Sequence, residues 1–292
     1  MIIKRIGVLA HPTRPQSAPV AERIAGTLTA QGLEVWQFSQ WDDSVVEEVI
    51  AGTDMVVAIG GDGAMLRAAR VCAEENVPIL GVNMGNLGFL TEIRTPENWD
   101  EAFAELLAGN YWIEQRMRIA ITATHGSEVV ARTDALNDVV ISRGALTRTI
   151  RLDTYIDHDW TTTYNADALI IATATGSTAY ALACGGPILP PELSNILVVP
   201  VAPHLSLERP LVLPEGAMVE VIVTPDSQTD VVLATDGIPM GNLCSGDQIT
   251  VKASEHVSRF VRLRERNYFY RSLLDRLEPR APVPSAPAKK QL

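Results

Sequence analysis

The stretch MVVAIGGDGAMLRAARVCAEENVPILGV, residues 55–82, decides the fold. It starts with an unbroken apolar run, Met55–Ile59, and passes through the glycine turn Gly60-Gly61-Asp62-Gly63. A helix-like segment, Ala64–Glu75, then leads to a second apolar run, Val77–Val82. Two short apolar runs on either side of a helical pattern predict a βαβ unit. Strands that are apolar throughout are typical of a parallel sheet covered by helices on both faces.

The same alternation extends on both sides of this stretch. Apolar runs at Ile6–Ala10 and Leu33–Phe38 flank a helical pattern over Val20–Gln31, and a further helix is predicted over Trp99–Leu107. We therefore expect an α/β domain with a Rossmann-like parallel sheet over residues 1–115.

After about Arg116 the sequence changes to short or alternating apolar segments, which predict a C-terminal all-β sandwich domain over residues 116–262. Its expected strands are Ile119–Thr124, Ala135–Ile141, Ile150–Ile156, Ala168–Ala172, Ile196–Val201, Val219–Val223, Val231–Ala234 and Ile249–Lys252. A short helix is predicted over Ser177–Ala183. Helical spacing over Arg266–Leu277 indicates that residues 263–278 return to the α/β domain, and the proline-rich residues 279–292 are expected to form a disordered tail.

Composition excludes several classes of protein. A net charge of −11 opposes the broad phosphate contact that nucleic-acid binders make, and no apolar run is long enough to cross a membrane. With only four lysines, none near the glycine turn, a Walker-type lysine is absent. Three scattered cysteines fit neither a disulfide framework nor a zinc site, so we expect a cytoplasmic protein.

The glycine turn at residues 60–63 has the features of an anion site. A strand, a glycine turn and a helix start together direct unpaired N–H groups and the helix dipole at one point. An ordinary tight turn is the alternative, because Asp-Gly is a favoured turn pair. The carboxylate of Asp62 would repel a phosphate unless it accepts a proton from an attacking hydroxyl or holds a cation, and this favours phosphoryl transfer. The P-loop motif and the G-x-G-x-x-G motif are both missing.

Two further segments carry polar groups among apolar residues. Asn137 and Asp138 lie inside a predicted strand and could bind an adenine edge or a ribose diol, although an Asx turn at the strand end is the alternative. Residues 175–187 combine hydroxyl side chains with two glycine segments around a short helix start, where Tyr180 could stack on a planar ring. The alternatives there are helix caps and a core tyrosine. The histidines show no paired metal-binding spacing, and Ser177 lacks the G-x-S-x-G context of a nucleophile.

In their order and spacing, these three segments together resemble the NAD kinases. The likeness also covers residues 81–83, 88–90, 185–187, 200–214 and Asp236-Gly237, and so extends over most of residues 1 to about 275. It implies an active site in the cleft between the two domains, and a homodimer or homotetramer. It further implies transfer of the ATP γ-phosphoryl group to the 2′-hydroxyl of the adenosine ribose of NAD, with a divalent cation, Mg²⁺, accompanying ATP.

The resemblance also assigns roles to residues. Asp62 would be the catalytic base, Gly61 and Gly63 would bind phosphate, and no protein metal ligand is identified. Asn137 and Asp138 would hold the ribose and adenine side of NAD, while Phe89 and Thr178–Ala183 would form the adenine pocket. The full set of expected binding residues is Gly61, Gly63, Arg67, Phe89, Asn137, Asp138, Arg148, Asn165, Asp167, Thr178, Ala179, Tyr180, Ala181, Leu182, Ala183 and Ala202.

The sequence departs from the family pattern at five positions. These are Ala64 for Thr, Asp138 for Glu, Ala168 for Gly, Ala174 for Pro and Ile238 for Gln. Whether polyphosphate replaces ATP, and whether NADH is accepted, stay open. The alternative functions are a related GGDG-loop kinase acting on a lipid or sugar hydroxyl, and a non-catalytic NAD(P)-binding sensor.

Overall fold

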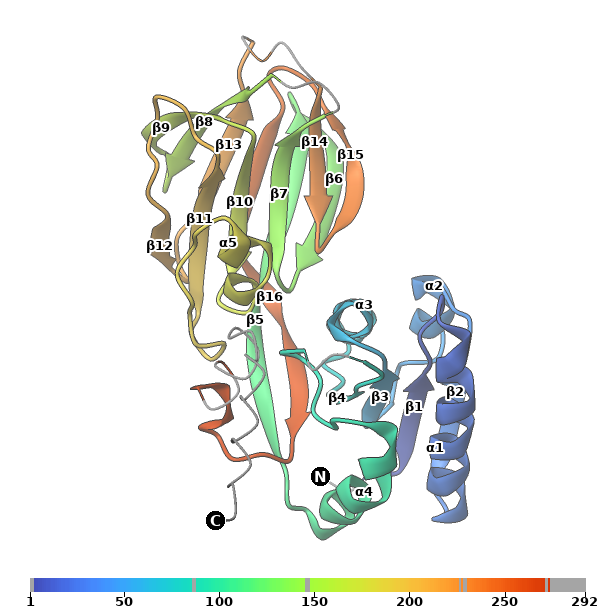
Figure 1. Ribbon diagram of the computed structural model, residues 1–292. Coiled ribbons are helices and arrows are strands. Elements are labelled where there is room, and N and C mark those ends of the chain that lie inside the picture. Colours follow the sequence, from blue (N-terminus) through green and yellow to red (C-terminus); the bar gives the residue numbers. More distant parts are fainter. Residues whose placement is uncertain are drawn as a thin grey trace, which may run out of the picture.

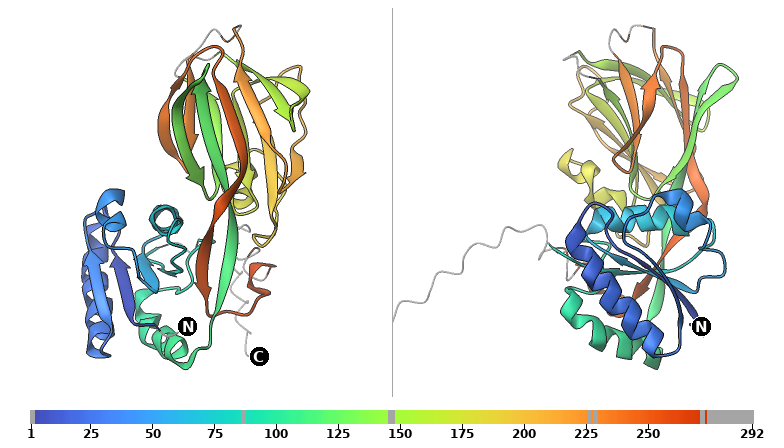
Figure 2. Two further views of the ribbon diagram at one scale, coloured as in Figure 1. Left: turned by 180° about the vertical axis from the view of Figure 1, so that it is seen from behind. Right: turned by 90° about the vertical axis from the view of Figure 1, so that its right-hand side faces the viewer.

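The computed structural model describes residues 3–85, 88–144, 148–225, 227, 230–270 and 273. The chain forms an α/β unit and a β-sandwich, and two long strands, β5 (Trp112–His125) and β16 (Gln248–Arg262), run from one to the other (Figure 1). The view from behind in Figure 2 shows the same two strands side by side along the junction. In the sequence, the sandwich therefore lies between the elements β1–α4 of the α/β unit and the end of β16, which pairs with β4 of the same unit.

A parallel sheet forms the centre of the α/β unit, in the order β2-β1-β3-β4. Its elements are β1 (Arg5–Leu9), α1 (Ala18–Ala30), β2 (Glu34–Phe38), α2 (Asp43–Glu47), β3 (Met55–Ile59), α3 (Asp62–Cys72), β4 (Ile79–Val82) and α4 (Trp99–Ala108). Helices α1 and α4 pack with Met55, Val57 and Ile59 on one face, and α2 and α3 pack with Val56 and Ala58 on the other. Because both faces are covered, every residue of β3 is buried and apolar.

The sandwich consists of two antiparallel layers. Its remaining strands are β6 (Glu128–Ala135), β7 (Asp138–Arg143), β8 (Ile150–Ile156), β9 (Asp159–Ala166), β10 (Ala168–Thr173), β11 (Asn195–Val201), β12 (Leu211–Pro214), β13 (Val219–Val223), β14 (Val231–Thr235) and β15 (Ile238–Leu243). One layer has the order β12-β11-β10-β7-β14-β15. The other contains β16, β13, β8 and β9, with β5 and β6 on the opposite side of β16.

The second layer continues into the α/β unit. Phe260 of β16 pairs with Ile79 of β4 in parallel, so that a single hydrogen-bonded sheet passes through both parts of the molecule. Side chains such as Ile121, Ile141, Leu169 and Val221 fill the space between the sandwich layers.

These observations confirm the expected fold class, an α/β unit with a parallel sheet and a separate all-β part. The residue pattern missed α2, β6, β9, β12 and β15, and it found only a short segment of β16. It also placed Ala135–Ile141 in one strand, whereas the chain bends at Leu136 and Asn137, between the end of β6 and the start of β7. Five of the six residues of β15 are exposed, so this strand has no apolar alternation to detect. The divisions at residues 115, 262 and 278 stay predictions, and the tail at 279–292 lies outside the described residues.

Among the described residues, no helix is both long and apolar enough to span a membrane. Cys72, Cys184 and Cys244 are free thiols; Cys72 is buried and Cys244 is exposed.

A cluster of buried charges lies where β5, β16 and the chain after β4 meet. We call it the junction cluster, and it consists of Glu92, Glu114, Arg116, Arg262 and Tyr268. Glu114 Oε2 accepts hydrogen bonds from Arg116 Nε at 3.0 Å and Arg262 Nε at 2.8 Å, while Oε1 accepts from the Tyr268 hydroxyl at 2.8 Å. Removing one partner of such a buried set would leave an uncompensated charge, which typically costs about 3–5 kcal/mol.

The arginines decide the ionisation of Glu114. Burial opposes the charged carboxylate, but Arg116 and Arg262 outweigh it and lower the pKa of Glu114 to about 2. The same kind of balance lowers the pKa of Glu92, where burial is outweighed by Arg264 and Arg262. Both carboxylates are therefore charged at neutral pH although they are buried.

We predict that acid unfolds the protein through the junction cluster. In the unfolded chain a glutamate has a pKa of about 4.3, so Glu114 stabilises the fold above that pH, and its contribution is lost as the pH falls toward 2. The contribution at pH 7 is on the order of 3 kcal/mol. Urea unfolding between pH 7 and pH 3 measures it.

The Glu114→Gln variant is the control for this measurement. It should be less stable than the wild type at pH 7 and should lose less stability between pH 5 and pH 3. An unfolding free energy that stays constant over this range in the wild type would contradict the prediction.

Candidate active site

The glycine turn after β3 opens directly into helix α3. Gly60 has a φ of +151°, and a Cβ atom there would lie 2.6 Å from the Cβ of Ala64. Gly60 is therefore required, and the small side chain of Ala64 leaves the space for it. A Cβ atom on Gly61 or Gly63, by contrast, would meet no atom within 4 Å, so the N-terminus of α3 is open to a ligand.

Asp62, the first residue of α3, is held by the chain that follows β4. Its Oδ2 accepts a hydrogen bond from the backbone N–H of Phe89 at 2.8 Å, and its Oδ1 accepts one from Leu90 at 3.0 Å. A Cβ on Gly88 would lie 2.0 Å from Oδ1, so only glycine allows this approach. Each carboxylate oxygen can accept a second hydrogen bond, so the group is fixed in place and still able to bind a hydroxyl.

Arg67, which was expected to contact a substrate, lies one turn further along α3. Its guanidinium stacks over the ring of Trp41 at 4.3 Å and forms an ion pair with Asp43 at 3.2 Å. His11 lies beside the glycine turn, 3.1 Å from the position of a Cβ on Gly60. Partial burial and then the charges of Arg14 and Arg67 lower the pKa of His11. His11 therefore lies within reach of the charges of Arg14 and Arg67.

The Asn137-Asp138 segment is shaped by a side chain that the sequence interpretation left without a role. Asp236 accepts hydrogen bonds from the backbone N–H groups of Leu136, Asn137 and Asp138, at 2.9, 2.7 and 3.2 Å. With positive φ at both Asp236 and Gly237, the Asp-Gly pair forms the two-residue turn between β14 and β15. The Asp-Gly pair could have predicted this turn, but its partners lie about 100 residues away in sequence.

Asp138 is a buried acid with a raised pKa. Burial, followed by the charge of Asp236, raises the pKa of Asp138 to about 7. Near neutral pH its carboxyl group is therefore protonated in part of the molecules, so it can donate a hydrogen bond as well as accept one.

The segment after β10 packs against Asn137. The Thr173 hydroxyl donates to the Leu136 carbonyl at 2.6 Å and accepts from the Gly176 N–H at 3.1 Å. A Cβ on Gly176 would lie 2.1 Å from the backbone oxygen of Asn137. The two segments that the sequence interpretation identified separately are therefore in direct contact.

Side chains in the segment 175–183 differ in whether they are buried in the fold or exposed at its surface. Ser177 is fully buried, and its hydroxyl joins the Ala174 carbonyl to the N–H of Leu189, so it serves the fold. Tyr180 begins the short helix α5 (Tyr180–Ala183) and is 46% exposed, which rules out the alternative of a core tyrosine. Ala181 is buried beneath it, whereas Thr178, Ala179, Leu182 and Ala183 keep part of their surface exposed.

Other expected binding residues lie near Tyr180 or at the neighbouring strand ends. Partial burial, Cys184, Asp167 and Asp138 together raise the pKa of Tyr180, which places these groups in one neighbourhood. Asp167 also pairs with Arg143 at 3.0 Å. Asn165 accepts a backbone hydrogen bond from His204, and the exposed Ala202 has a φ of +47°. Arg148 is exposed at the end of the loop before β8.

The junction cluster touches both halves of this site. Arg262 Nη1 donates to the Leu90 carbonyl at 3.0 Å, and Arg116 Nη1 contacts the Thr175 hydroxyl at 3.4 Å. Figures 1 and 2 place α5 at the end of the sandwich that faces the α/β unit. The structure thus brings the Asp62 loop and the Thr175–Tyr180 segment to the same junction.

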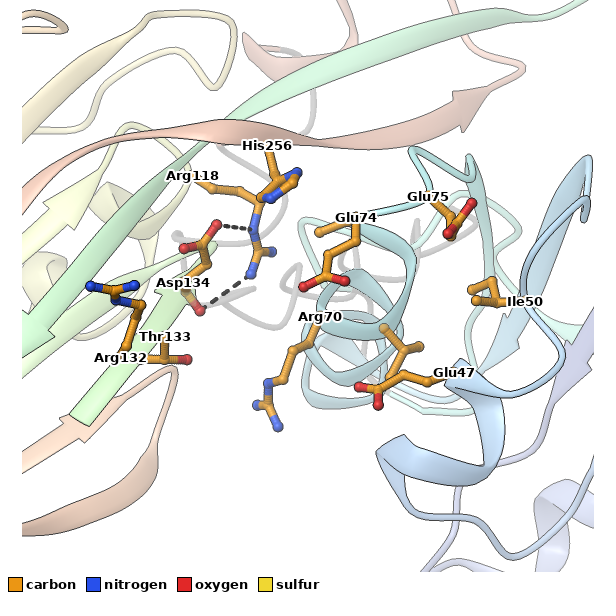
Figure 3. Close-up of a pocket in the computed structure, with 12 residues that line it drawn as sticks. Glu47, Ile50, Arg70, Glu74, Glu75, Arg118, Arg132, Thr133, Asp134 and His256 are labelled. Carbon is orange, nitrogen blue, oxygen red and sulfur yellow. Dashed lines mark hydrogen bonds and ion pairs between the residues drawn. The ribbon is translucent and has the colours of Figure 1, made fainter. Parts of the chain in front are cut away.

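A separate cavity of about 510 Å³ lies at the other end of α3, between α2, α3 and the strands β5 and β6 (Figure 3). Its lining combines three arginines and His256 with the four carboxylates of Glu47, Glu74, Glu75 and Asp134. Because these charges largely cancel, the cavity is not suited to a triphosphate. Across the described residues, no group of three or more His, Cys, Asp or Glu side chains could hold a metal ion.

Two family models match separate parts of the chain. Family models of the ATP-NAD kinase N-terminal and C-terminal domains match residues 20–111 and 136–263. The NAD kinase of Dehalococcoides mccartyi is 36% identical over 276 residues, covering 94% of this chain and 96% of the relative. That of Chloroflexus aurantiacus is 37% identical, covering 94% and 99%.

Two solved structures share the fold. Yeast NADH kinase, crystallised with NADH, has a TM-score of 0.83 and 24% identity over 94% of this chain and 87% of its own. An NAD kinase from Archaeoglobus fulgidus, in complex with ATP, has a TM-score of 0.72 and 25% identity over 92% and 97%.

We predict that Gly176→Ala destabilises the protein by about 1–3 kcal/mol, because the new Cβ would overlap the backbone oxygen of Asn137. Gly63→Ala is the matched control, since its Cβ meets no atom within 4 Å and α3 gains a better helix former. Urea unfolding measures both variants. Equal loss of stability in the two would contradict the packing described between residues 137 and 176.

Proposed function

The chain belongs to the NAD kinase family, and we propose that it transfers the γ-phosphoryl group of ATP to the 2′-hydroxyl of the adenosine ribose of NAD, yielding NADP. The observation that carries this proposal is Asp62, a carboxylate fixed by two backbone N–H groups at the open N-terminus of α3. The names of relatives at 36–37% identity over almost the whole chain support NAD as the acceptor and a kinase reaction.

We propose that the phosphates of ATP bind at the N-terminus of α3. The open positions at Gly61 and Gly63 let a phosphate approach the backbone N–H groups, and the positive end of the helix dipole attracts it. Arg67 adds positive charge near this end while it stays paired with Asp43. Magnesium would enter bound to ATP, where it neutralises charge on the triphosphate. Most of its ligands would then be phosphate oxygens and waters, because Mg²⁺ usually binds only one or two protein carboxylates.

Asp62 would act as the base that accepts the proton of the 2′-hydroxyl. Its hydrogen bonds to residues 89 and 90 prevent rotation of the carboxylate and leave a lone pair on each oxygen for the substrate. Phosphoryl transfer depends mainly on positioning and charge stabilisation, so a fixed acceptor beside a phosphate site is the arrangement that the reaction requires.

We propose that the adenosine of NAD binds between Asn137, Asp138 and Tyr180. Asp138 can donate to one ribose hydroxyl and accept from the other near neutral pH, because its pKa is raised to about 7. The exposed ring of Tyr180 is free to stack on the adenine, with Thr178, Ala179 and the rest of α5 forming the pocket. Phe89, whose ring lies 6.5 Å from that of Phe269, would close its other side.

The remaining expected contacts extend toward the nicotinamide end. We assign Asn165, Asp167 and Arg148 to contacts with NAD and Ala202 to the nicotinamide side, following the family pattern. We also propose a homodimer or homotetramer in the cytoplasm.

We predict that Asp62→Asn lowers kcat for NADP formation by about 10²–10⁴-fold while NAD still binds, because the proton acceptor is lost and the hydrogen-bonding shape is kept. The measurement is NADP produced by purified protein from NAD, ATP and Mg²⁺. Asp100→Asn, in the first turn of α4, is the control and should leave the rate unchanged. A rate for Asp62→Asn within threefold of the wild type would refute the assignment.

We predict that Tyr180→Ala weakens NAD binding by roughly 1–3 kcal/mol, about 5- to 150-fold in Kd, by loss of base stacking. Because the ring is half exposed, the melting temperature without ligand should hardly change. Tyr180→Phe keeps the ring and should bind NAD nearly as well as the wild type. Calorimetric titration and thermal unfolding test both expectations, and a large fall in the apo melting temperature would count against stacking.

A further inference from the structure

We propose that Arg262 is a positioning residue for the phosphoryl transfer, because it fixes the peptide segment that orients the Asp62 carboxylate. This inference rests on the proposed function, in which Asp62 is the catalytic base. Arg262 lies about 200 residues from Asp62 in sequence and acts through Leu90.

One residue connects the two side chains. Arg262 Nη1 donates to the carbonyl oxygen of Leu90 at 3.0 Å, and the N–H of the same Leu90 donates to Asp62 Oδ1 at 3.0 Å. The preceding N–H, that of Phe89, donates to the other carboxylate oxygen at 2.8 Å. Both contacts that orient Asp62 therefore come from a segment whose backbone is held by the guanidinium.

Arg262 is itself immobilised from several sides. It is fully buried, and its Nε and Nη2 lie 2.8 and 2.7 Å from Glu114, while Nη1 lies 3.3 Å from Glu92. The rings of Phe260 and Tyr268 each lie 5.2 Å from the guanidinium carbon. Burial by itself would lower the pKa of Arg262, but Glu114, Tyr268 and Glu92 raise it, so the charge is permanent.

The guanidinium has a shape that lysine cannot replace here. Its planar set of N–H groups reaches two carboxylates and one carbonyl at the same time, whereas an ammonium group is a compact charge on a flexible chain. A lysine at position 262 would keep the positive charge between Glu92 and Glu114. It would lose the fixed contact to the Leu90 carbonyl, so that the charge and the positioning contact can be separated by experiment.

The experiment compares Arg262→Lys with Arg118→Lys in the NADP assay. Arg118 is a buried arginine on β5 whose hydrogen bonds go to Ala69, Ser258 and Asp134 instead of Leu90. We expect Arg262→Lys to lower kcat about 10- to 100-fold, as misplacement of a reacting group does, with KM for NAD and ATP within about twofold. Arg118→Lys should leave kcat within about twofold of the wild type at a temperature where both variants are folded.

A double-mutant cycle with Asp62→Asn tests whether Arg262 acts through Asp62. If it does, Arg262→Lys should change the residual rate of the Asp62→Asn variant by less than about twofold, because the oriented base is already gone. A merely structural role would lower the rate by the same factor in both backgrounds. That additive result would overturn the proposal, as would an unchanged kcat or an equal loss in Arg118→Lys.

Tyr268→Phe keeps the test decisive if Arg262→Lys does not fold. It removes only the hydroxyl that donates to Glu114 and accepts from Arg116, so it loosens the cluster without removing a charge. It should lower kcat several-fold in the same cycle, and additivity with Asp62→Asn would again overturn the proposal.

If Asp62→Asn alone keeps its activity, the proposed function fails; if it is inactive while the cluster variants keep full kcat, only this inference fails.

Discussion

The way the two parts of the molecule meet depends on the buried carboxylate of Glu114, whose charge must be compensated. A carboxylate in the interior requires partners on every side, and here they come from β5, from β16 and from the segment after it. β5 lies about 150 residues before the other two pieces in the sequence, so satisfying one side chain fixes how the two parts of the protein meet. The same arginines then contact Leu90 and Thr175, which makes the compensation of charge and the assembly of the site a single structural event.

The sequence pattern predicted the elements whose burial is uniform. Met55–Ile59 is apolar because helices cover both of its faces, and that requirement is local enough to be visible in five residues. The pattern failed where buried polar groups find their partners far away in the sequence. Glu114, Arg116 and Arg118 alternate along β5 as buried charges, so they interrupt the apolar pattern of a strand whose partners lie elsewhere in the chain.

The site shows the same limit. Asp62, Asn137 and Tyr180 could be singled out because glycine turns and isolated polar residues mark them within a few positions. The family likeness included Gly88 and Asp236 but gave neither of them a role, since their importance comes from the close approach to Asp62 and from three backbone N–H groups about 100 residues away. Tyr180 was ambiguous because a ring beside buried alanines fits either a core or a surface, and only its exposure in the folded chain separates the two.

The parallel pairing of Phe260 with Ile79 has a consequence for synthesis of the chain on the ribosome. Strand β4 emerges early, and the chain at Ile93 pairs with its C-terminal end, but Phe260, which pairs with Ile79, follows about 180 residues later. At ordinary elongation rates this delay lasts roughly 10 to 35 s. During that time the edge of this apolar strand at Ile79 lacks its partner from β16, and an unpaired strand edge favours aggregation with other nascent chains. The protein should therefore need chaperone protection of its N-terminal third until β16 has been translated.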